Sequence, residues 1–281
     1  MMSSEAGTDS AVAIVAPRTS NLERILRVAV PVGMLVLAVL AWHLTVTINQ
    51  IPRYILPSPA DVWGSLTTDY PTLLPALGVT LRITFSALGL ALVGGVLLAI
   101  VLVQSKWIEL ALFPFAVVLQ VTPIVAIAPL LLIYTPNTQT ALLICAFLVA
   151  FFPILSNMVA GLKSVDHNLL NLFDLYGANR WQTLLYLKIP AAMPYFMAGL
   201  RIGGGLALIA AVVAEFAAGQ AGAQSGLAFR ILEAGYRLNI PRMFAALLML
   251  TATGVAIFGL TSFLAWLVLH RWHESAVRRE N

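Results

Sequence analysis

The sequence predicts an all-α membrane protein with about six transmembrane helices, and its composition and apolar patterning both lead to this prediction. Of its 281 residues, 60% are hydrophobic and 10% are charged. A soluble domain carries about 25% charged residues, because water must wet its surface. Six apolar segments are also long enough to cross a bilayer, which takes roughly 20 residues. An even number of spans puts both termini on the same side of the membrane.

The domain plan is a transmembrane domain at residues 28–270 between two short tails. The N-terminal tail, residues 1–27, is rich in Ala, Ser and Thr, and its apolar stretch at residues 11–16 is too short for a signal-peptide core. We expect the beginning of this tail to be disordered and not cleaved. Residues 271–281 form the C-terminal tail. The predicted spans are Val28–Ile48, Leu77–Val103, Leu110–Tyr134, Thr140–Leu162, Pro194–Ala217 and Met243–His270.

The distribution of basic residues predicts the orientation of these spans. Cytoplasmic loops of membrane proteins carry an excess of Lys and Arg. Ten basic residues fall on the side that holds the termini, and four fall on the other side. Both termini are therefore predicted to be cytoplasmic. The ten are Arg18, Arg24, Arg27, Lys106, Lys163, Arg180, Lys188, Arg271, Arg278 and Arg279, and the four are Arg53, Arg230, Arg237 and Arg242.

The outer loop before the second span and the prolines of the third span are the next local signals. In the loop at residues 49–75, Ser58 or Asp61 could cap a short helix that runs to Asp69. In the third span, Pro123 and Pro129 each remove a backbone donor and leave carbonyls free, which a bilayer tolerates only next to protein or a polar cavity. These two prolines either kink the helix for packing or line a transport pathway.

Two ionisable residues within spans are candidates for an outer gate. Arg82 lies near the outer end of the second span and Glu215 near the outer end of the fifth. Charges in a bilayer are costly and usually functional, so we expect the two to pair or to line the gate together. The alternative for each is a side chain that reaches the interface. The glycine-rich segment Gly219–Gly235 is a candidate docking and gating region; it includes Gly222, Gly226, Arg230 and Glu233.

A polar segment at residues 163–190 interrupts the apolar second half of the chain. Asp166 or Asn168 can cap a helix there, and Gly177 permits a sharp bend because glycine takes positive φ without a penalty. Exposed aromatic residues after the cap, such as Phe173 and Trp181, suit a helix that docks in a partner's groove. The alternative is a helix that lies flat on the lipid.

The spacing within this segment resembles a pattern in the membrane subunits of bacterial ABC importers. That pattern is Glu-Ala-Ala, three residues, Gly, nine residues and Ile-x-Leu-Pro; here Asn171-Leu172-Phe173 is followed by Gly177 and by Leu187-Lys188-Ile189-Pro190. Further motifs resemble the nitrate/sulfonate/taurine class of these permeases, over residues 56–269. They are Leu56-Pro57-Ser58-Pro59, Phe151-Phe152-Pro153, Gly199-Leu200-Arg201-Ile202 and Val213-Ala214-Glu215.

The sequence departs from the family pattern at two places. Asn171 stands where the pattern has its acidic residue. After the third span, residues 133–137 read Ile-Tyr-Thr-Pro-Asn in place of the usual Trp-Phe-Gly. These departures concern the partner contact and the substrate, respectively.

The resemblance implies the type I ABC importer permease fold (MetI-like) in a bacterial inner membrane. It implies a permease homodimer, with a heterodimer as the alternative, an extracytoplasmic solute-binding protein, and partner ATPase subunits that bind ATP and Mg²⁺. The chain itself is then a transport subunit and not an enzyme: its one phosphate-loop candidate, at residues 161–164, has Leu162 where a glycine must precede the lysine. We expect no catalytic residue, cofactor or metal in this chain. The residues implied in ATPase coupling are Asn171, Leu172, Phe173, Asp174, Gly177, Ala178, Arg180 and Pro190.

The substrate implied by the resemblance is a small anion of the nitrate, sulfonate or taurine type. The altered residues after the third span leave an alternative open, namely a pyrimidine, a riboflavin-like compound or another vitamin precursor. A stand-alone secondary transporter or channel is a rival of another class. Such a protein should carry several Asp, Glu or His residues at mid-membrane, and the predicted spans have almost none. The sequence contains no run of Lys and Arg, so we do not expect it to bind nucleic acid.

Overall fold

The computed structural model describes residues 21–219 and 225–270, and throughout these ranges the regular structure is helical. Five helices are long and apolar enough to cross a membrane, and there are six candidate spans if a pair of helices bent by 98° is counted as one. The predicted all-α membrane fold with about six spans is therefore confirmed. The elements are α1 (Asn21–Ile48), α2 (Pro59–Gln104), α3 (Lys106–Val121), α4 (Ile124–Tyr134), α5 (Thr138–Lys163), α6 (His167–Leu175), α7 (Arg180–Thr183), the π-helical turn η1 (Leu184–Lys188), α8 (Ile189–Ala218), α9 (Leu227–Tyr236) and α10 (Ile240–Leu269).

The chain divides into two compact units, residues 1–51 and residues 52–281. The first unit contains α1, which begins at Asn21 and so takes up the last seven residues of the predicted N-terminal tail. Its apolar side chains are largely exposed, with Met34 at 65% and Leu35 at 67%. An apolar helix with such exposure suits contact with lipid. Residues 1–20, which were predicted to be disordered, lie outside the described residues. The predicted C-terminal tail, residues 271–281, also lies outside them.

Helix α2 opens the second unit and corrects the prediction for the outer loop. Ser58 caps it as expected, because the Asp61 N–H donates to Ser58 Oγ at 3.2 Å and the Ser58 N–H donates to Asp61 Oδ2 at 3.0 Å. The helix does not end near Asp69, however, and continues for 46 residues through Pro71 and Pro75. Both prolines lie on the exposed side, where the carbonyls that they free are accessible, while the opposite side of the helix is buried. Since 46 residues span about 69 Å, the N-terminal part of α2 is longer than a bilayer core requires and projects beyond it.

The third predicted span is broken rather than straight. Helices α3 and α4 meet at 98°, with the break at Thr122 and Pro123. Pro123 has no N–H to continue the ladder, and the Thr122 N–H and hydroxyl both donate to the Val118 carbonyl, which ends α3. The second turn of α4 buries Ala128 in an apolar cluster with residues of α2, of the N-terminal half of α5 and of the C-terminal half of α8. The predicted span over Leu110–Tyr134 is therefore interrupted at one of the prolines that the sequence marked as a kink or a break.

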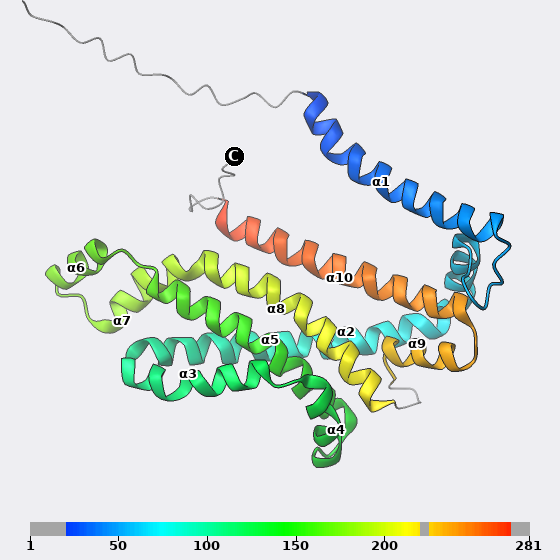
Figure 1. The fold of residues 1–281 in the computed structure, drawn as a ribbon. Coiled ribbons are helices and arrows are strands. Elements are labelled where there is room, and N and C mark those ends of the chain that lie inside the picture. Colours follow the sequence, from blue (N-terminus) through cyan, green and yellow to red (C-terminus); the bar gives the residue numbers. More distant parts are fainter. Residues whose placement is uncertain (1–20, 220–224, 271–281) are drawn as a thin grey trace, which may run out of the picture. The chain divides into compact units, whose positions relative to one another are not determined.

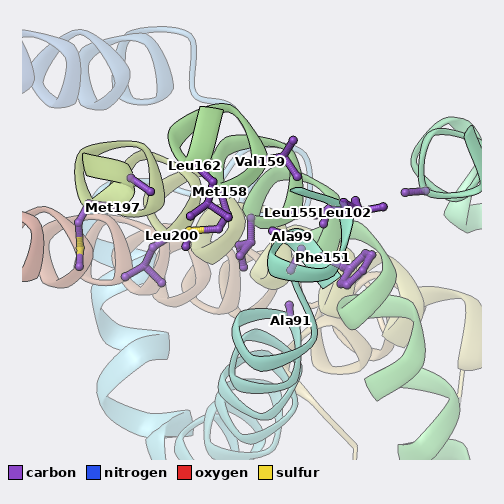
Figure 2. Close-up of a cluster of buried hydrophobic side chains, with 14 of the residues drawn as sticks. Ala91, Ala99, Leu102, Phe151, Leu155, Met158, Val159, Leu162, Met197 and Leu200 are labelled. Atoms are coloured by element: carbon purple, nitrogen blue, oxygen red, sulfur yellow. The ribbon is translucent and has the colours of Figure 1, made fainter. Parts of the chain in front are cut away.

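The centre of the second unit is the packing of α5 along α8 and α2, which Figure 1 shows as long neighbouring helices. Figure 2 shows their apolar core, in which Leu102 of α2, Leu155 and Leu162 of α5 and Leu200 of α8 are buried. Small residues allow this close approach. A Cβ on Gly161 would lie 2.8 Å from the Ala192 Cα, so α5 and α8 are in direct backbone contact there.

The fifth predicted span begins earlier than the sequence suggested. Helix α7, the turn η1 and α8 form one apolar run over Arg180–Ala218, so the second half of the polar segment is the base of this span. Figure 1 shows α6 and α7 at one end of the long helices of this unit and α9 at the opposite end. The two regions with functional signals in the sequence are thus far apart along the spans.

Candidate functional site

The polar segment forms two short helices joined by a tight bend. Asp166 caps α6 by accepting from the Asn168 N–H at 2.8 Å, as the sequence predicted. Gly177 has φ +68°, in the left-handed region that glycine adopts without strain. Asn179 then caps α7, and the Asn179 and Gln182 side chains each accept a hydrogen bond of 2.8 Å from the other's backbone N–H. These local bonds fix the direction of each helix on either side of the bend.

The two helices present an apolar hollow of about 460 Å³. Tyr176, at 82% exposed, and Tyr186, at 73%, lie at its surface. Trp181 nearby is 66% exposed. Large apolar side chains gathered at the exposed surface where a span ends usually mark an interaction site. The residues that line the hollow are Leu172, Phe173, Tyr176, Ala178, Gln182 and Tyr186.

The structure places the other coupling candidates around this hollow or on the adjoining helices. Asn171, Asp174 and Arg180 are exposed, so each is available to a polar partner group. Pro190 lies in the first turn of α8, where its missing N–H costs no hydrogen bond. In place of the missing acid, the Asn171 amide oxygen and the neighbouring Asp174 carboxylate are exposed acceptors.

At the opposite end, Glu215 anchors α9 to α2 and α8. Its side chain is 2% exposed, accepts from the Thr80 hydroxyl at 2.8 Å and accepts from the Ala228 N–H at 3.0 Å. Thr80 Oγ1 in turn accepts from the Leu227 N–H at 2.9 Å. Helix α9 has no cap from its own N-cap residue, Gly226. The buried carboxylate and hydroxyl thus satisfy the free N–H groups at the start of α9.

Gly226 is part of this anchor because its backbone lies against the Glu215 carboxylate. A Cβ at this position would lie 2.1 Å from Glu215 Oε1 and 2.2 Å from Oε2. The contacts of Thr80 and Gly226 with Glu215 were not predicted from the sequence. The only signal was the concentration of glycines between residues 219 and 235, of which Gly222 lies outside the described residues.

The ion pair expected between Arg82 and Glu215 is absent among the described residues. Arg82 is two residues beyond Thr80, about 200° around α2, and therefore points away from the face that meets Glu215. It is exposed and borders a hollow of about 470 Å³ that Asn137, Gln139 and Thr140 also line. About 22 residues, or roughly 33 Å, separate it from the other end of α2, so it lies near one boundary of a bilayer core.

The two prolines of the gate prediction lie at the broken third span. Pro123 is the N-cap residue of α4 and Pro129 lies inside the same helix, and both are exposed in the single chain. Their position at a 98° break is consistent with either packing or a pathway. The pathway role of these two residues and of Arg82 and Glu215 stays a prediction.

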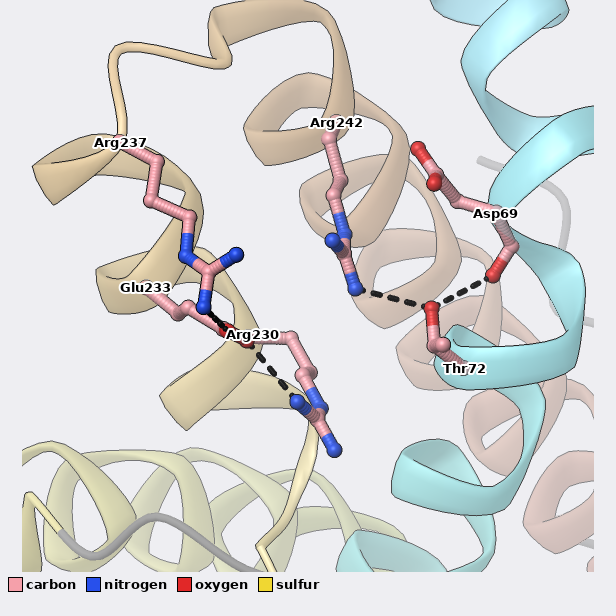
Figure 3. Close-up of polar contacts among 6 residues, drawn as sticks. All are labelled: Asp69, Thr72, Arg230, Glu233, Arg237 and Arg242. Atoms are coloured by element: carbon pink, nitrogen blue, oxygen red, sulfur yellow. Dashed lines mark hydrogen bonds and ion pairs between the residues drawn. The ribbon is translucent and has the colours of Figure 1, made fainter.

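Helix α9 carries a polar network beside this anchor, which Figure 3 shows together with α2 and α10. Glu233 pairs with Arg230 at 2.9 Å and with Arg237 at 2.9 Å. The hydrogen bond from Arg230 holds the pKa of Glu233 below its ordinary value, so the carboxylate is charged at neutral pH. Arg242 of α10 donates to Thr72 Oγ1 of α2 at 2.9 Å. These contacts connect α10 to the projecting part of α2 and brace the C-terminal half of α9.

Comparison with known proteins identifies the family. A family model described as the binding-protein-dependent transport system inner membrane component matches residues 91–279. The chain belongs to this family. It is therefore a membrane-spanning permease subunit of an ABC importer, a transport component that works with an ATPase and a binding protein.

Named relatives match over most of the chain. The riboflavin transport system permease protein of Chloroflexus aurantiacus is 34% identical, over 93% of this chain and 97% of the relative. The formylaminopyrimidine transport permease protein of Halalkalibacterium halodurans is 29% identical over 80% of this chain and 88% of the relative. The taurine transport system permease protein of Escherichia coli is 28% identical over 85% of each chain.

A solved structure supports the fold. The crystal structure of an amino acid ABC transporter with histidines matches with a TM-score of 0.58 and 21% identity, and covers 72% of this chain and 96% of that chain. At this identity the likeness concerns the fold alone. Together with the family match it confirms the predicted type I importer permease fold.

Proposed function

We propose that this permease works as a homodimer whose α6–α7 segment docks the ATPase subunits, and that the solute crosses between the two protomers. The apolar hollow of α6 and α7 carries this proposal, because it exposes Leu172 and Tyr176 between two spans and Tyr186 at the base of the next span. A helix or loop of the ATPase would fill it. ATP and Mg²⁺ bind to the ATPase, and closure of the ATPase pair tilts the spans to alternate access.

The transported solute is proposed to be a heteroaromatic vitamin or vitamin precursor. The relative named for riboflavin has 34% identity over nearly the whole chain, and the relative named for formylaminopyrimidine supports the same class. The second candidate is a small anion of the nitrate, sulfonate or taurine type. It is favoured by the taurine relative and by Arg82, which faces a polar hollow without an acidic partner among the described residues.

Uptake by the reconstituted importer tests both candidates. The permease, its ATPase and its binding protein are placed in proteoliposomes with ATP, and uptake of labelled riboflavin, a formylaminopyrimidine, taurine and nitrate is compared. We expect ATP-dependent uptake of one of the two heterocycles, and replacement of Arg82 by Gln should leave that uptake within about threefold of the parent. Uptake of taurine or nitrate that disappears with Arg82→Gln would assign the anion class instead.

The orientation proposed for the spans places α6 and α7 in the cytoplasm and α9 outside. Cys145 is the only cysteine and is 1% exposed, so Cys145→Ala gives a background without reactive thiols. In that background, Tyr176→Cys and Tyr236→Cys introduce thiols at sites that are 82% and 86% exposed. A membrane-impermeant maleimide should label Tyr236→Cys in intact spheroplasts, and Tyr176→Cys only after permeabilisation. The reverse labelling pattern would contradict the orientation.

A further inference from the structure

All three lysines of the chain line one hollow at the end of the spans that carries α6. The sequence contains only Lys106, Lys163 and Lys188, while its other basic residues are arginines. They come from three separate elements, as the first residue of α3 and the last residues of α5 and η1. The hollow has a volume of about 390 Å³, within the range of small-molecule sites. The three lysines therefore form one concave site, and are not charges scattered over the surface.

The charges of this hollow do not balance. Lys163 donates to the Glu109 carboxylate at 2.6 Å, so one acid and one ammonium compensate each other. Lys106 and Lys188 have no ion-pair or hydrogen-bond partner among the described residues, and Lys188 is half-buried. A partly buried ammonium without a counter-ion is unfavourable. Two positive charges therefore remain that an anion from outside the chain can neutralise.

The surroundings of the hollow fit a membrane interface. Its other walls are apolar, from Leu102, Leu162 and Leu170 among others, and the adjoining Trp107 is 81% exposed. Tryptophan at a span end is typical of the level of the lipid headgroups. Basic pockets between helices on the cytoplasmic side bind anionic headgroups. Lysine suits this role because its ammonium is a compact charge on a flexible stem that adapts to a phosphate.

We propose that this hollow binds one phosphate group, carried by an anionic phospholipid of the inner leaflet or by free phosphate. The assignment to the inner leaflet rests on the orientation proposed above. Leu170 of α6 and Lys188 at the base of α8 both border the site, so a bound phosphate contacts the two ends of the α6–α7 segment. Occupancy of the hollow then holds this segment in place at the membrane surface and makes ATPase coupling sensitive to anionic lipid.

Lipid retention by the full-length permease, purified with a co-expressed ATPase, tests the site. Native mass spectrometry after exchange into detergent with phosphatidylglycerol or phosphatidylcholine counts the bound lipids. We expect the parent to retain phosphatidylglycerol selectively. Apparent affinity should fall about fivefold in Lys106→Gln or Lys188→Gln, and on the order of 25-fold in the double variant. Arg53→Gln, which removes an exposed cation in the loop before α2, is the matched control and should bind like the parent.

The lipid counts show whether the hollow binds a phosphate group and whether that group belongs to a lipid. Equal retention of phosphatidylcholine, or unchanged phosphatidylglycerol binding in Lys106→Gln and Lys188→Gln, would overturn the proposal. Displacement of the lipid by millimolar inorganic phosphate would assign the site to free phosphate, and no displacement would assign it to the lipid. Lipids are counted whether or not an ATPase co-purifies, so a missing ATPase counts against the proposed function alone. If the double variant is poorly folded, Lys106→Gln alone decides, because this side chain is exposed.

Discussion

Replacement of Gly226 by alanine is expected to detach α9 from α2 and α8 and to lower the free energy of unfolding by about 3–5 kcal/mol. The new methyl group would lie 2.1 Å from Glu215 Oε1. The carboxylate is at the end of a flexible side chain, but its movement is costly. It is 2% exposed, and a shift would break its bonds to Thr80 and Ala228 and leave a buried polar group without partners. Thermal unfolding of the purified permease measures the loss.

Gly235→Ala is the matched control on the same helix. A Cβ there meets only Met243 Sδ at 3.8 Å, which is ordinary contact, so this variant should be as stable as the parent or slightly more stable. The carboxylate's part is isolated by a double-mutant cycle with Glu215→Ala. Because that substitution removes the atoms that clash, adding Gly226→Ala to it should cost much less than in the parent. Additive losses in the cycle would rule out the Glu215 contact as the reason that position 226 is glycine.

The sequence was sufficient for features that depend on neighbouring residues. The Asp166 cap and the bend at Gly177 were predicted because a cap joins residues two or three apart and a positive φ is a property of one residue. The six spans were predicted because hydrophobicity and length alone decide which segments can cross a bilayer. The family motif at residues 171–190 was recognised for the same reason, because it is a spacing of residues within one short segment.

The sequence was insufficient where the structure depends on contacts between distant residues. Glu215 was recognised as a costly charge, but its partner Thr80 is 135 residues away and is an ordinary residue among several threonines. Arg82 was predicted as the partner because it has the opposite charge and a similar depth in the membrane. In the structure, however, Thr80 lies on the side of α2 that meets α8, and Arg82 lies on another side. In the same way, Pro123 marked a weak point in the third span, but the 98° break is set by the packing of Ala128 on the neighbouring helices.

Replacement of Leu172 by aspartate is expected to abolish ATPase docking while the permease itself stays folded. Leu172 is 44% exposed and lines the hollow of α6 and α7, so a carboxylate there meets water in the free permease. In the complex the same carboxylate would be buried in an apolar contact without a partner. At a central interface position this should weaken ATPase association by at least about 30-fold. Co-purification and binding of the ATPase to the detergent-solubilised permease measure the change.

The same substitution at Leu238 provides the control, because that residue is 71% exposed on the loop after α9, at the opposite end of the spans from α6. Its φ of +53° also suits aspartate. Leu238→Asp should bind the ATPase like the parent. A second variant, Gly177→Val, tests the bend: a β-branched residue at φ +68° is strained, so α6 and α7 should change their relative direction and binding should weaken without any new charge. Parent-like ATPase binding in both Leu172→Asp and Gly177→Val would show that the ATPase docks elsewhere on the permease.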